Sequence, residues 1–500
     1  MESNENNPKT PFKPINTPEM DAWLTSFFIE NHLDYYTYPD HAATPEQVRF
    51  MVYLKDNEQY YPCSDRMFET IMSAKKSAFM QEKYNMVLQK VLRLINSQIE
   101  EKREKDYLKS LIKIKYNHET KDEIMIPSRI EKRLLRIFQN HAQIEDPCIL
   151  EKALSNRRTS MALRSDAFNQ ALNHFDSSDL ANPPATLIEF KEIIERLELK
   201  RLFCLSVENS LWKSDNAESY TKNDYLKLFN RQFTGNGVEP LFRFLGALGK
   251  GKPLGTAQSK KILWLADEAG EVMVDLAIVQ VLAKLGHKII IAFKEGPLYT
   301  KVNFIDTQEN EILSRELEGA FVIPEKSLSK NELIKILRSD QHIITISDGT
   351  RENLNLLLAS TTFARIFKEV DGVISRGDDQ RRRFFDTHFQ FTQDIFNIAG
   401  GAHNSVSILY RPRHPAVVKF SHEDLEKKAK TIIDQMEEAK RKGMTVIFYS
   451  GIIGSIPGKI QMAKKIMAVF IQSLKKQLAR IFIINPSEYY EPGMDADDLM

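Results

Sequence analysis

The pattern of apolar and polar positions changes character about halfway along the chain. From about residue 19 to 250, apolar residues recur mainly every three or four positions, which predicts amphipathic helices such as 81–99 and 127–139. From residue 261 onwards, short apolar runs alternate with helical patterns. The predicted strands are 261–266, 288–293, 342–347, 372–375, 406–410, 445–449 and 479–484, and the predicted helices include 330–338, 354–368, 423–442 and 460–477.

This alternation predicts an α/β fold, in which a doubly wound, mostly parallel sheet domain is preceded by an all-helical N-terminal domain. A length of 500 residues also favours more than one domain. The predicted parts are a disordered tail at 1–18, a helical domain at 19–248, a hinge at 249–260, and an α/β domain at 261–500 that carries the metal- and phosphate-binding residues described below.

Composition narrows the classes of partner. The chain has 69 Lys and Arg residues and 68 Asp and Glu residues, and a net charge of +1 favours neither a nucleic acid nor a membrane. The first residues lack the apolar centre of a secretion signal, and no apolar stretch is long enough to span a bilayer. We therefore expect a cytoplasmic protein, and the sequence leaves its oligomeric state open.

The stretch 261–306 predicts one strand–helix–strand unit with an acidic turn. The strand at 261–266 ends in Asp267, Glu268 and Glu271, and a helical pattern follows. Ligands of parallel sheets bind beyond the carboxyl ends of the strands, where these acids would lie. Their mutual repulsion is relieved either by a hard divalent cation or by the helix N-terminus that they cap. On spacing alone, both interpretations stay open.

Two later strand ends also carry polar groups. Asp348 follows the strand at 342–347 and either holds a substrate or metal-bound water, or forms an ordinary turn. The strand at 445–449 leads into a glycine-rich turn that suits either anion binding or close packing of strand and helix. The residues proposed for anion binding there are Ser450, Gly451, Ser455 and Lys459.

The acidic turn resembles the core motif of the damage-control phosphatase family, also described as acidic-residue-methyltransferase-like or as domain of unknown function eighty-nine. Its members carry an Asp-Asn-x-Gly-x-Glu type turn after a strand and a further Asp on the following helix. Asp267, Gly270 and Asp275 match this pattern, whereas Glu268 replaces the family's metal-binding Asn. The chain would form a divergent, larger subgroup, because the phosphatase core does not account for residues beyond about 400.

Two segments of the helical half resemble the same family, in the same order along the chain. Asp146–Pro147, followed by Lys152 and Asn156, resembles an Asp-Pro…Lys…Asn segment, and Leu211–Trp212 is similar to part of a Leu-Trp-Gly-Asn segment. A proline-started helix and an aromatic anchor are the alternative interpretations.

The loop after the second strand departs from the family pattern. Thr300 and Lys301 stand where the family has an Asn-Asp pair, whose Asp is a metal ligand, and Asp306 matches a later acid. A lysine there would repel a cation or occupy its place, so Asp306 would have to compensate. At a later strand end, Arg376 and Gly377 correspond to the family's phosphate-binding Lys-Gly, and Arg suits phosphate through two parallel hydrogen bonds.

The resemblance implies a metal-dependent phosphatase that acts on a small phosphorylated metabolite, such as a sugar phosphate. Asp267, Glu268 and Asp306 would hold Mg²⁺, Mn²⁺, Co²⁺ or Ni²⁺, and the catalytic residues would be Asp267, Asp348 and Arg376. The first alternative is a catalytically inactive relative that binds a ligand or a partner. The second is an S-adenosylmethionine-dependent carboxyl methyltransferase, although the turn lacks the usual Gly-x-Gly.

Overall fold

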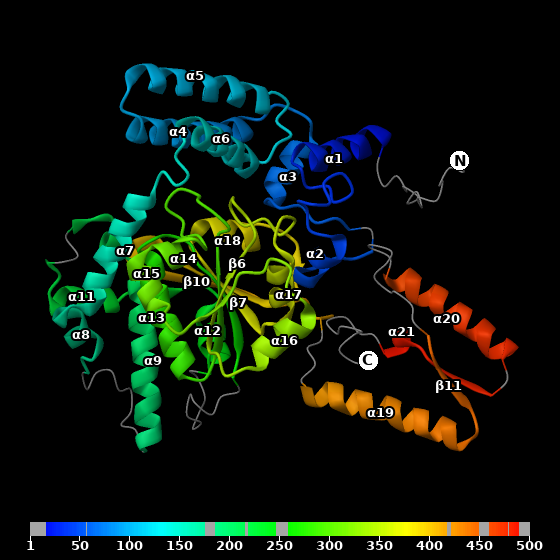
Figure 1. Cartoon of the computed structure of the whole chain (residues 1–500). Coiled ribbons are helices and arrows are strands. Elements are labelled where there is room, and N and C mark those ends of the chain that lie inside the picture. Colours follow the sequence, from blue (N-terminus) through cyan, green and yellow to red (C-terminus); the bar gives the residue numbers. More distant parts are fainter. Residues whose placement is uncertain are drawn as a thin grey trace. The chain divides into compact units, whose positions relative to one another are not determined.

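Figure 1 shows the computed structural model of the chain, which describes residues 17–56, 58–175, 186–215, 219–246, 259–417, 422–449, 460–478 and 480–489. The described residues divide into two compact units. One is drawn from Met1–Ala42 and Cys63–Glu145, and the other from Ala43–Pro62 and Asp146–Met500. No helix in this described part of the chain combines the length and apolar character needed to cross a membrane.

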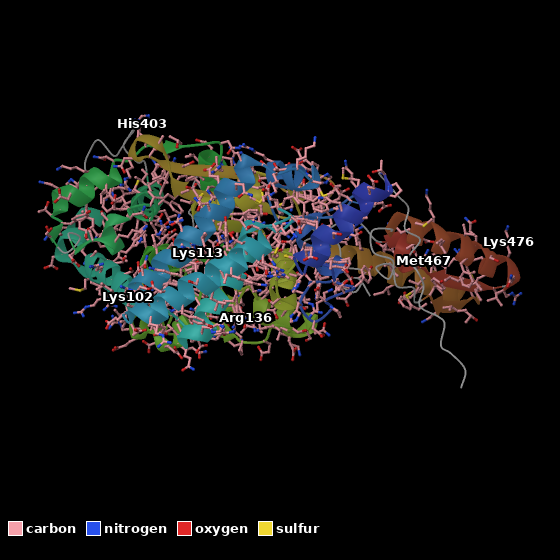
Figure 2. The ribbon with its side chains drawn as sticks, turned by 90° about the horizontal axis from the view of Figure 1, so that it is seen from above. Lys102, Lys113, Arg136, His403, Met467 and Lys476 are labelled. Carbon is pink, nitrogen blue, oxygen red and sulfur yellow. The ribbon has the colours of Figure 1, made fainter. Side chains whose placement is uncertain are left out.

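The first unit is helical. Its helices are α1 (Pro18–Glu30), α3 (Asp65–Met72), α4 (Ala78–Gln98), α5 (Lys102–Glu119) and α6 (Pro127–Ala142). Helix α4 packs against α5 and α6, and Tyr84, Val91 and Leu134 are fully buried, as their helical spacing predicts. The charged face of α5 is exposed, with Lys102 and Lys113 labelled on it in Figure 2.

The second unit contains an eight-stranded sheet. Its strands are β2 (Phe233–Thr234), β3 (Lys261–Leu265), β4 (Lys288–Phe293), β5 (Phe321–Ile323), β6 (Ile343–Ser347), β7 (Gly372–Arg376), β9 (Asp394–Gly400) and β10 (Val406–Arg411). The order is β2-β10-β9-β7-β3-β4-β6-β5, and all neighbours are parallel except β9 and β10. The predicted doubly wound, mostly parallel sheet is therefore confirmed.

Helices cover both faces of this sheet. Helices α7 (Ile149–Arg164), α9 (Leu187–Leu205) and α13 (Glu271–Lys284) gather on one side, and α16 (Lys330–Arg338) and α17 (Thr361–Glu369) lie on the other (Figure 1). On the first side, Trp264 and Phe203 are fully buried in one apolar core. This core fixes the acidic turn that follows β3, because α13 begins directly after that turn.

The two units are not separated at the predicted hinge. Helices α7 and α9 belong with the sheet because both pack against α13, so the unit boundary falls at Glu145 rather than near residue 249. Residues 247–258, which include most of the predicted hinge, lie outside the described residues, as do residues 1–16 of the predicted tail.

The last two predicted strands form a small sheet of their own. β11 (Thr445–Phe448) pairs in parallel with β12 (Ile481–Ile484). The helices of this part are α19 (His422–Arg441), α20 (Ile460–Gln477) and α21 (Pro486–Tyr489). Ile432 and Ile484 are buried in its core. Among the described residues, the predicted α/β domain at 261–500 thus contributes strands to three sheets. The third sheet is formed by β8 (Gln390–Phe391), which pairs with β1 (Val52–Tyr53).

Candidate functional site

Several predicted functional residues follow the ends of neighbouring parallel strands. Asp267 follows β3, Asp348 follows β6, and Gly377 follows β7. The chain builds the sheet outward from β3 through β4 to β6 and then adds β7 on the opposite side of β3. Such a reversal of strand order is where α/β sheets bind ligands. Asp267 and Gly377 lie at this point, and Cβ of a residue larger than glycine at 377 would be 3.0 Å from an Asp267 carboxylate oxygen.

The acidic turn is held in place by the segments that resembled the family in the helical half. Gly270 has a φ of +82°, and its N–H donates to Asn156 Oδ1 of α7 at 2.7 Å. A Cβ atom at residue 270 would lie 2.2 Å from Cβ of Trp212 in α10 (Ser210–Lys213). Glycine is therefore required here both for its backbone conformation and for the close approach of the tryptophan.

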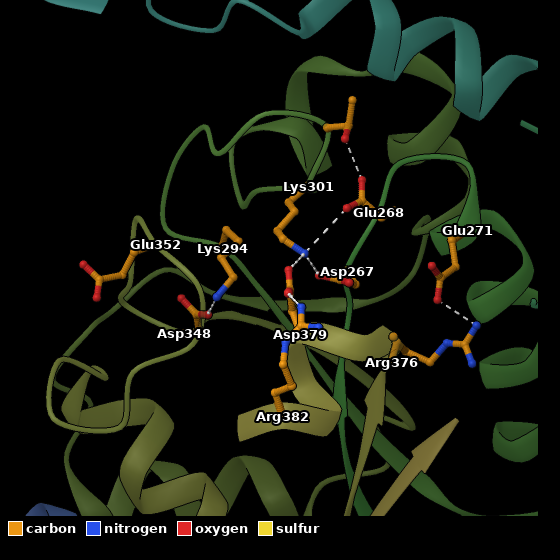
Figure 3. A network of polar contacts seen from close by, with 12 residues as sticks. Asp267, Glu268, Glu271, Lys294, Lys301, Asp348, Glu352, Arg376, Asp379 and Arg382 are labelled. Carbon is orange, nitrogen blue, oxygen red and sulfur yellow. Dashed lines mark hydrogen bonds and ion pairs between the residues drawn. The ribbon is translucent and has the colours of Figure 1, made fainter. Parts of the chain in front are cut away.

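Lys301 lies at the centre of this edge. The loop that carries it is bonded to the acidic turn, because Val302 N–H donates to the Asp267 carbonyl and Ala269 N–H to the Thr300 carbonyl, both at 2.9 Å. The Lys301 ammonium group donates to the Asp267 carboxylate. It lies 3.5 Å from a carboxylate oxygen of Glu268 and of Asp379, so one cation is shared by three acids (Figure 3).

This cluster is shielded from solvent. Lys301 is 4% exposed and Asp267 is 5% exposed. Burial raises the pKa of Asp267 to about 6, although Lys301 opposes the shift. Burial acts against the charged form of Lys301 too, but the neighbouring carboxylates outweigh it and raise the pKa of Lys301 above its ordinary value. The surrounding carboxylates therefore favour the charged ammonium form of Lys301.

The carboxylates of the cluster make two further contacts. Thr300 Oγ1 donates to Glu268 Oε2 at 2.6 Å, and the Arg382 guanidinium pairs with the Asp379 carboxylate. Asp379 was not assigned a role from the sequence. Its position in the first turn of α18 (Gly377–Phe385), directly after a parallel strand, is the signal that would have found it.

The predicted metal ligands do not form one group. Asp306 is bound to a different lysine, since Lys152 Nζ lies 2.6 Å from Asp306 Oδ1 and 2.5 Å from Oδ2, and the same lysine pairs with Asp146 at 2.5 Å. Across the described ranges, no three His, Cys, Asp or Glu side chains are grouped as a metal site. The residues at Asp267 do not fit a divalent ion, because the Lys301 ammonium group lies where their oxygens converge.

Asp348 forms a second buried lysine–carboxylate pair. Lys294, the residue after β4, places Nζ 2.6 Å from Asp348 Oδ2. The other oxygen, Oδ1, accepts from Thr350 N–H at 2.7 Å and from Thr350 Oγ1 at 2.9 Å. Burial raises the pKa of Asp348, opposed by Lys294. Sequence reasoning missed Lys294, although a lysine directly after an all-apolar parallel strand indicates a buried counter-charge.

Arg376 is buried and forms its ion pairs and hydrogen bonds with other residues of the protein. It is 1% exposed, and its guanidinium lies 2.7 Å from Glu271 Oε1 and 3.0 Å from Asp275 Oδ1. It also donates to the carbonyls of Ser206 at 2.6 Å and Ile398 at 3.2 Å. In Figure 3 its side chain extends toward Glu271 rather than toward the Lys301 cluster. The structure therefore uses the charge of Arg376 to neutralise the helix α13 acids.

The glycine-rich turn after β11 is the predicted anion-binding segment. Ser450, Gly451, Ser455 and Lys459 all lie outside the described residues. Their predicted role in anion binding stays a prediction.

Comparison with known proteins agrees with the motifs at this edge. The family model for the damage-control phosphatase ARMT1-like domain matches residues 79–429, more than half of the chain. The chain belongs to this family. The ARMT1-like match includes β3, the acidic turn, Lys301 and α18. It ends within α19, so both strands of the small C-terminal sheet lie beyond it.

A solved structure can be set beside this ARMT1-like chain. The crystal structure of a DUF89 family protein from Pyrococcus horikoshii is similar over 67% of this chain and 98% of that chain, with 14% sequence identity and a TM-score of 0.46. No curated protein sequence matches this chain.

Proposed function

We propose that this chain is an ARMT1-like family member that binds a small phosphorylated metabolite at the carboxyl edge of the sheet without hydrolysing it. The observation that carries the proposal is the Lys301 ammonium group among Asp267, Glu268 and Asp379. Metal-assisted hydrolysis requires a divalent cation that polarises a phosphoryl oxygen and activates a water. An ammonium group supplies one charge and three hydrogen bonds but has no coordination position to offer, so it does neither.

The two departures from the family's metal pattern face each other. Glu268 and Lys301 are paired in an isolated antiparallel bridge, and their side chains lie 3.5 Å apart. Either residue alone would unbalance the charge of the turn, whereas together they form an ion pair. This pairing supports a site whose cation is built into the chain.

The ligand class rests on family membership, and the described residues supply groups that suit it. Helix α18 begins directly after β7 with no side-chain cap on its first N–H groups, and helix N-termini of this kind bind phosphate. The Lys301 ammonium group would provide a further donor. Because the Arg376 guanidinium is already occupied by Glu271 and Asp275, we place the phosphate at the α18 N-terminus and not at Arg376.

The test measures metal binding and catalysis together. Calorimetric titration of the whole chain with Mn²⁺, Co²⁺, Ni²⁺ and Mg²⁺ should give no binding, and aryl phosphate should not be hydrolysed with any of them. The double variant Glu268→Asn with Lys301→Asp restores the family's ligand types and should gain metal binding. Glu438→Asn with Lys442→Asp makes the same change at an exposed ion pair at the C-terminal end of α19 and should gain none.

A second candidate function, a metal-dependent phosphatase, is favoured by the family match itself. It requires Lys301 to leave the carboxylates when the ion enters. Stoichiometric metal binding and metal-dependent turnover by the unmodified chain would establish it and would overturn the proposal of a non-hydrolysing protein. If a panel of sugar phosphates fails to raise the melting temperature, the ligand class is wrong even where the metal result holds.

A further inference from the structure

A second candidate site lies away from the acidic turn. A cavity of about 380 Å³ is lined by residues of α9, of β2 and the segment before it, and of α12 (Val238–Phe244), within the size range of small-molecule sites. The residues that give it its chemistry are Arg196, Lys200, Arg231, Phe233, Glu239 and Phe242. Three cations thus face one acid, the opposite balance to that of the Lys301 cluster.

Two of the cations form no ion pair with another described residue. Arg196 and Lys200 lie one turn apart on α9 and so share a helix face. Within the described ranges neither forms an ion pair, and Glu239, which also lines the cavity, pairs with neither. Burial, together with the nearby Arg196, lowers the pKa of Lys200. Half-buried cations that repel one another are stabilised when an anion lies between them.

The third cation, Arg231, has one hydrogen-bond donor that the described residues leave unpaired. The Arg231 guanidinium pairs with Glu208 and donates from Nη1 to the Cys204 carbonyl at 3.0 Å. Its side chain is 5% exposed, and its Nε–H is buried without a hydrogen-bond partner among the described residues. Buried donors are rarely left unpaired, and Arg231 lines the cavity, so an acceptor that binds beside it would complete its hydrogen bonding.

The remaining wall is aromatic. Phe233 and Phe242 line the cavity, and the Arg196 guanidinium lies 5.7 Å from the centre of the Phe242 ring. A cation stacked on an aromatic ring keeps its edge free for hydrogen bonds to a planar acceptor. The walls therefore offer charged donors on one side and apolar ring surface on the other.

We propose that this cavity binds a small organic anion that carries a phosphate or carboxylate group next to an apolar part. The anionic group is held by Arg196, Lys200 and the Nε–H of Arg231, and the apolar part packs on Phe233 and Phe242. The site shares no residue with the Lys301 cluster. It is therefore independent of the function proposed above.

The test is calorimetric titration of the whole chain with phenyl phosphate, benzoate and inorganic phosphate. Lys200→Met and, separately, Arg196→Gln should weaken binding of the preferred anion about tenfold or more, since each removes a charged hydrogen-bond donor. Lys191→Met is the matched control: this lysine lies on the same helix, is 73% exposed and pairs with Glu195. The control should bind like the unmodified chain.

Comparison of the three probes separates the two halves of the proposal. Tighter binding of phenyl phosphate or benzoate than of inorganic phosphate supports contact with the rings, and it shows which anionic group is preferred. Equal affinity for all three would overturn the apolar half. No binding of any probe, or equal binding by the control, Lys200→Met and Arg196→Gln chains with unchanged melting temperatures, would overturn the proposal as a whole.

Discussion

Replacement of Lys301 by Met tests whether one lysine holds the acidic turn together. Methionine keeps the length of the side chain and removes only its charge. The change leaves the buried carboxylate of Asp267 without its direct partner and removes the cation from Glu268 and Asp379. Breaking a buried pair by removing one partner costs about 3–5 kcal/mol, because the remaining charge is uncompensated.

The structure places the expected cost at the lower end of this range. Burial already raises the pKa of Asp267 to about 6 in the presence of Lys301. Without the lysine that pKa rises further, so Asp267 takes up a proton at neutral pH and limits the penalty. We therefore expect a loss of about 3 kcal/mol. Unfolding entropy grows with the number of residues, so for a unit of this size the loss is a fall in melting temperature of about 4 °C.

The assay is thermal unfolding followed by near-ultraviolet circular dichroism. Lys326→Met serves as control, because Lys326 is 59% exposed and its ion pair with Glu295 is worth less than about 1 kcal/mol. Adding Asp267→Asn to Lys301→Met should recover part of the loss by removing the stranded charge. A Lys301→Met chain that melts within about 1 °C of the unmodified protein would refute the central role of this lysine.

Two further predictions concern the same turn. Gly270→Ala should lower the free energy of unfolding by about 3 kcal/mol or more, because a Cβ atom there meets Trp212. Gly286→Ala, with a similar φ of +90° and nothing within 4 Å, should lower it only by the backbone strain of about 1–2 kcal/mol. Equal losses of the two variants in urea unfolding would contradict this prediction. Burial, with Asp275 nearby and Arg376 opposing, raises the pKa of Glu271 to about 8, so folded-state stability should fall as pH rises from about 4.5 through 8. Glu271→Gln should flatten the upper part of this pH profile, and an unchanged slope between about pH 6 and 9 would show that another group is responsible.

The sheet was largely predictable because its strands are marked by local sequence. The runs that became β3, β4, β6, β7 and β10 are apolar and end in charged or small residues, and the predicted ends lie within one residue of those observed. β9 was missed because Asn397 interrupts its apolar run. The Nδ2 group of that side chain donates to Ser375 Oγ and to the Gly377 carbonyl of the neighbouring strand and helix, contacts that a local pattern does not reveal.

The partners of buried charges were not predictable from the sequence. Arg376 was assigned to phosphate by its position after a strand, yet it pairs with two acids one helical turn apart on α13. Asp306 was assigned to a metal, yet it pairs with Lys152, more than 150 residues earlier in the chain. In both cases several charged groups lie at similar distances from a strand end. Only the packing of the helices decides which of these groups form ion pairs with each other.

The charge balance of the acidic turn explains why a metal ion and Lys301 exclude each other. A divalent ion about 4 Å from the ammonium group would be repelled by about 8 kcal/mol at an effective dielectric constant of about 20. A micromolar metal site is worth about the same free energy, so the repulsion alone would cancel such binding. Glu268 adds one negative charge but also pairs with Lys301, and it therefore holds the lysine in place as much as it attracts an ion. Metal binding by this chain thus depends on whether Lys301 can leave three carboxylates at once, which is why the Glu268→Asn, Lys301→Asp variant should acquire a site that the unmodified chain lacks.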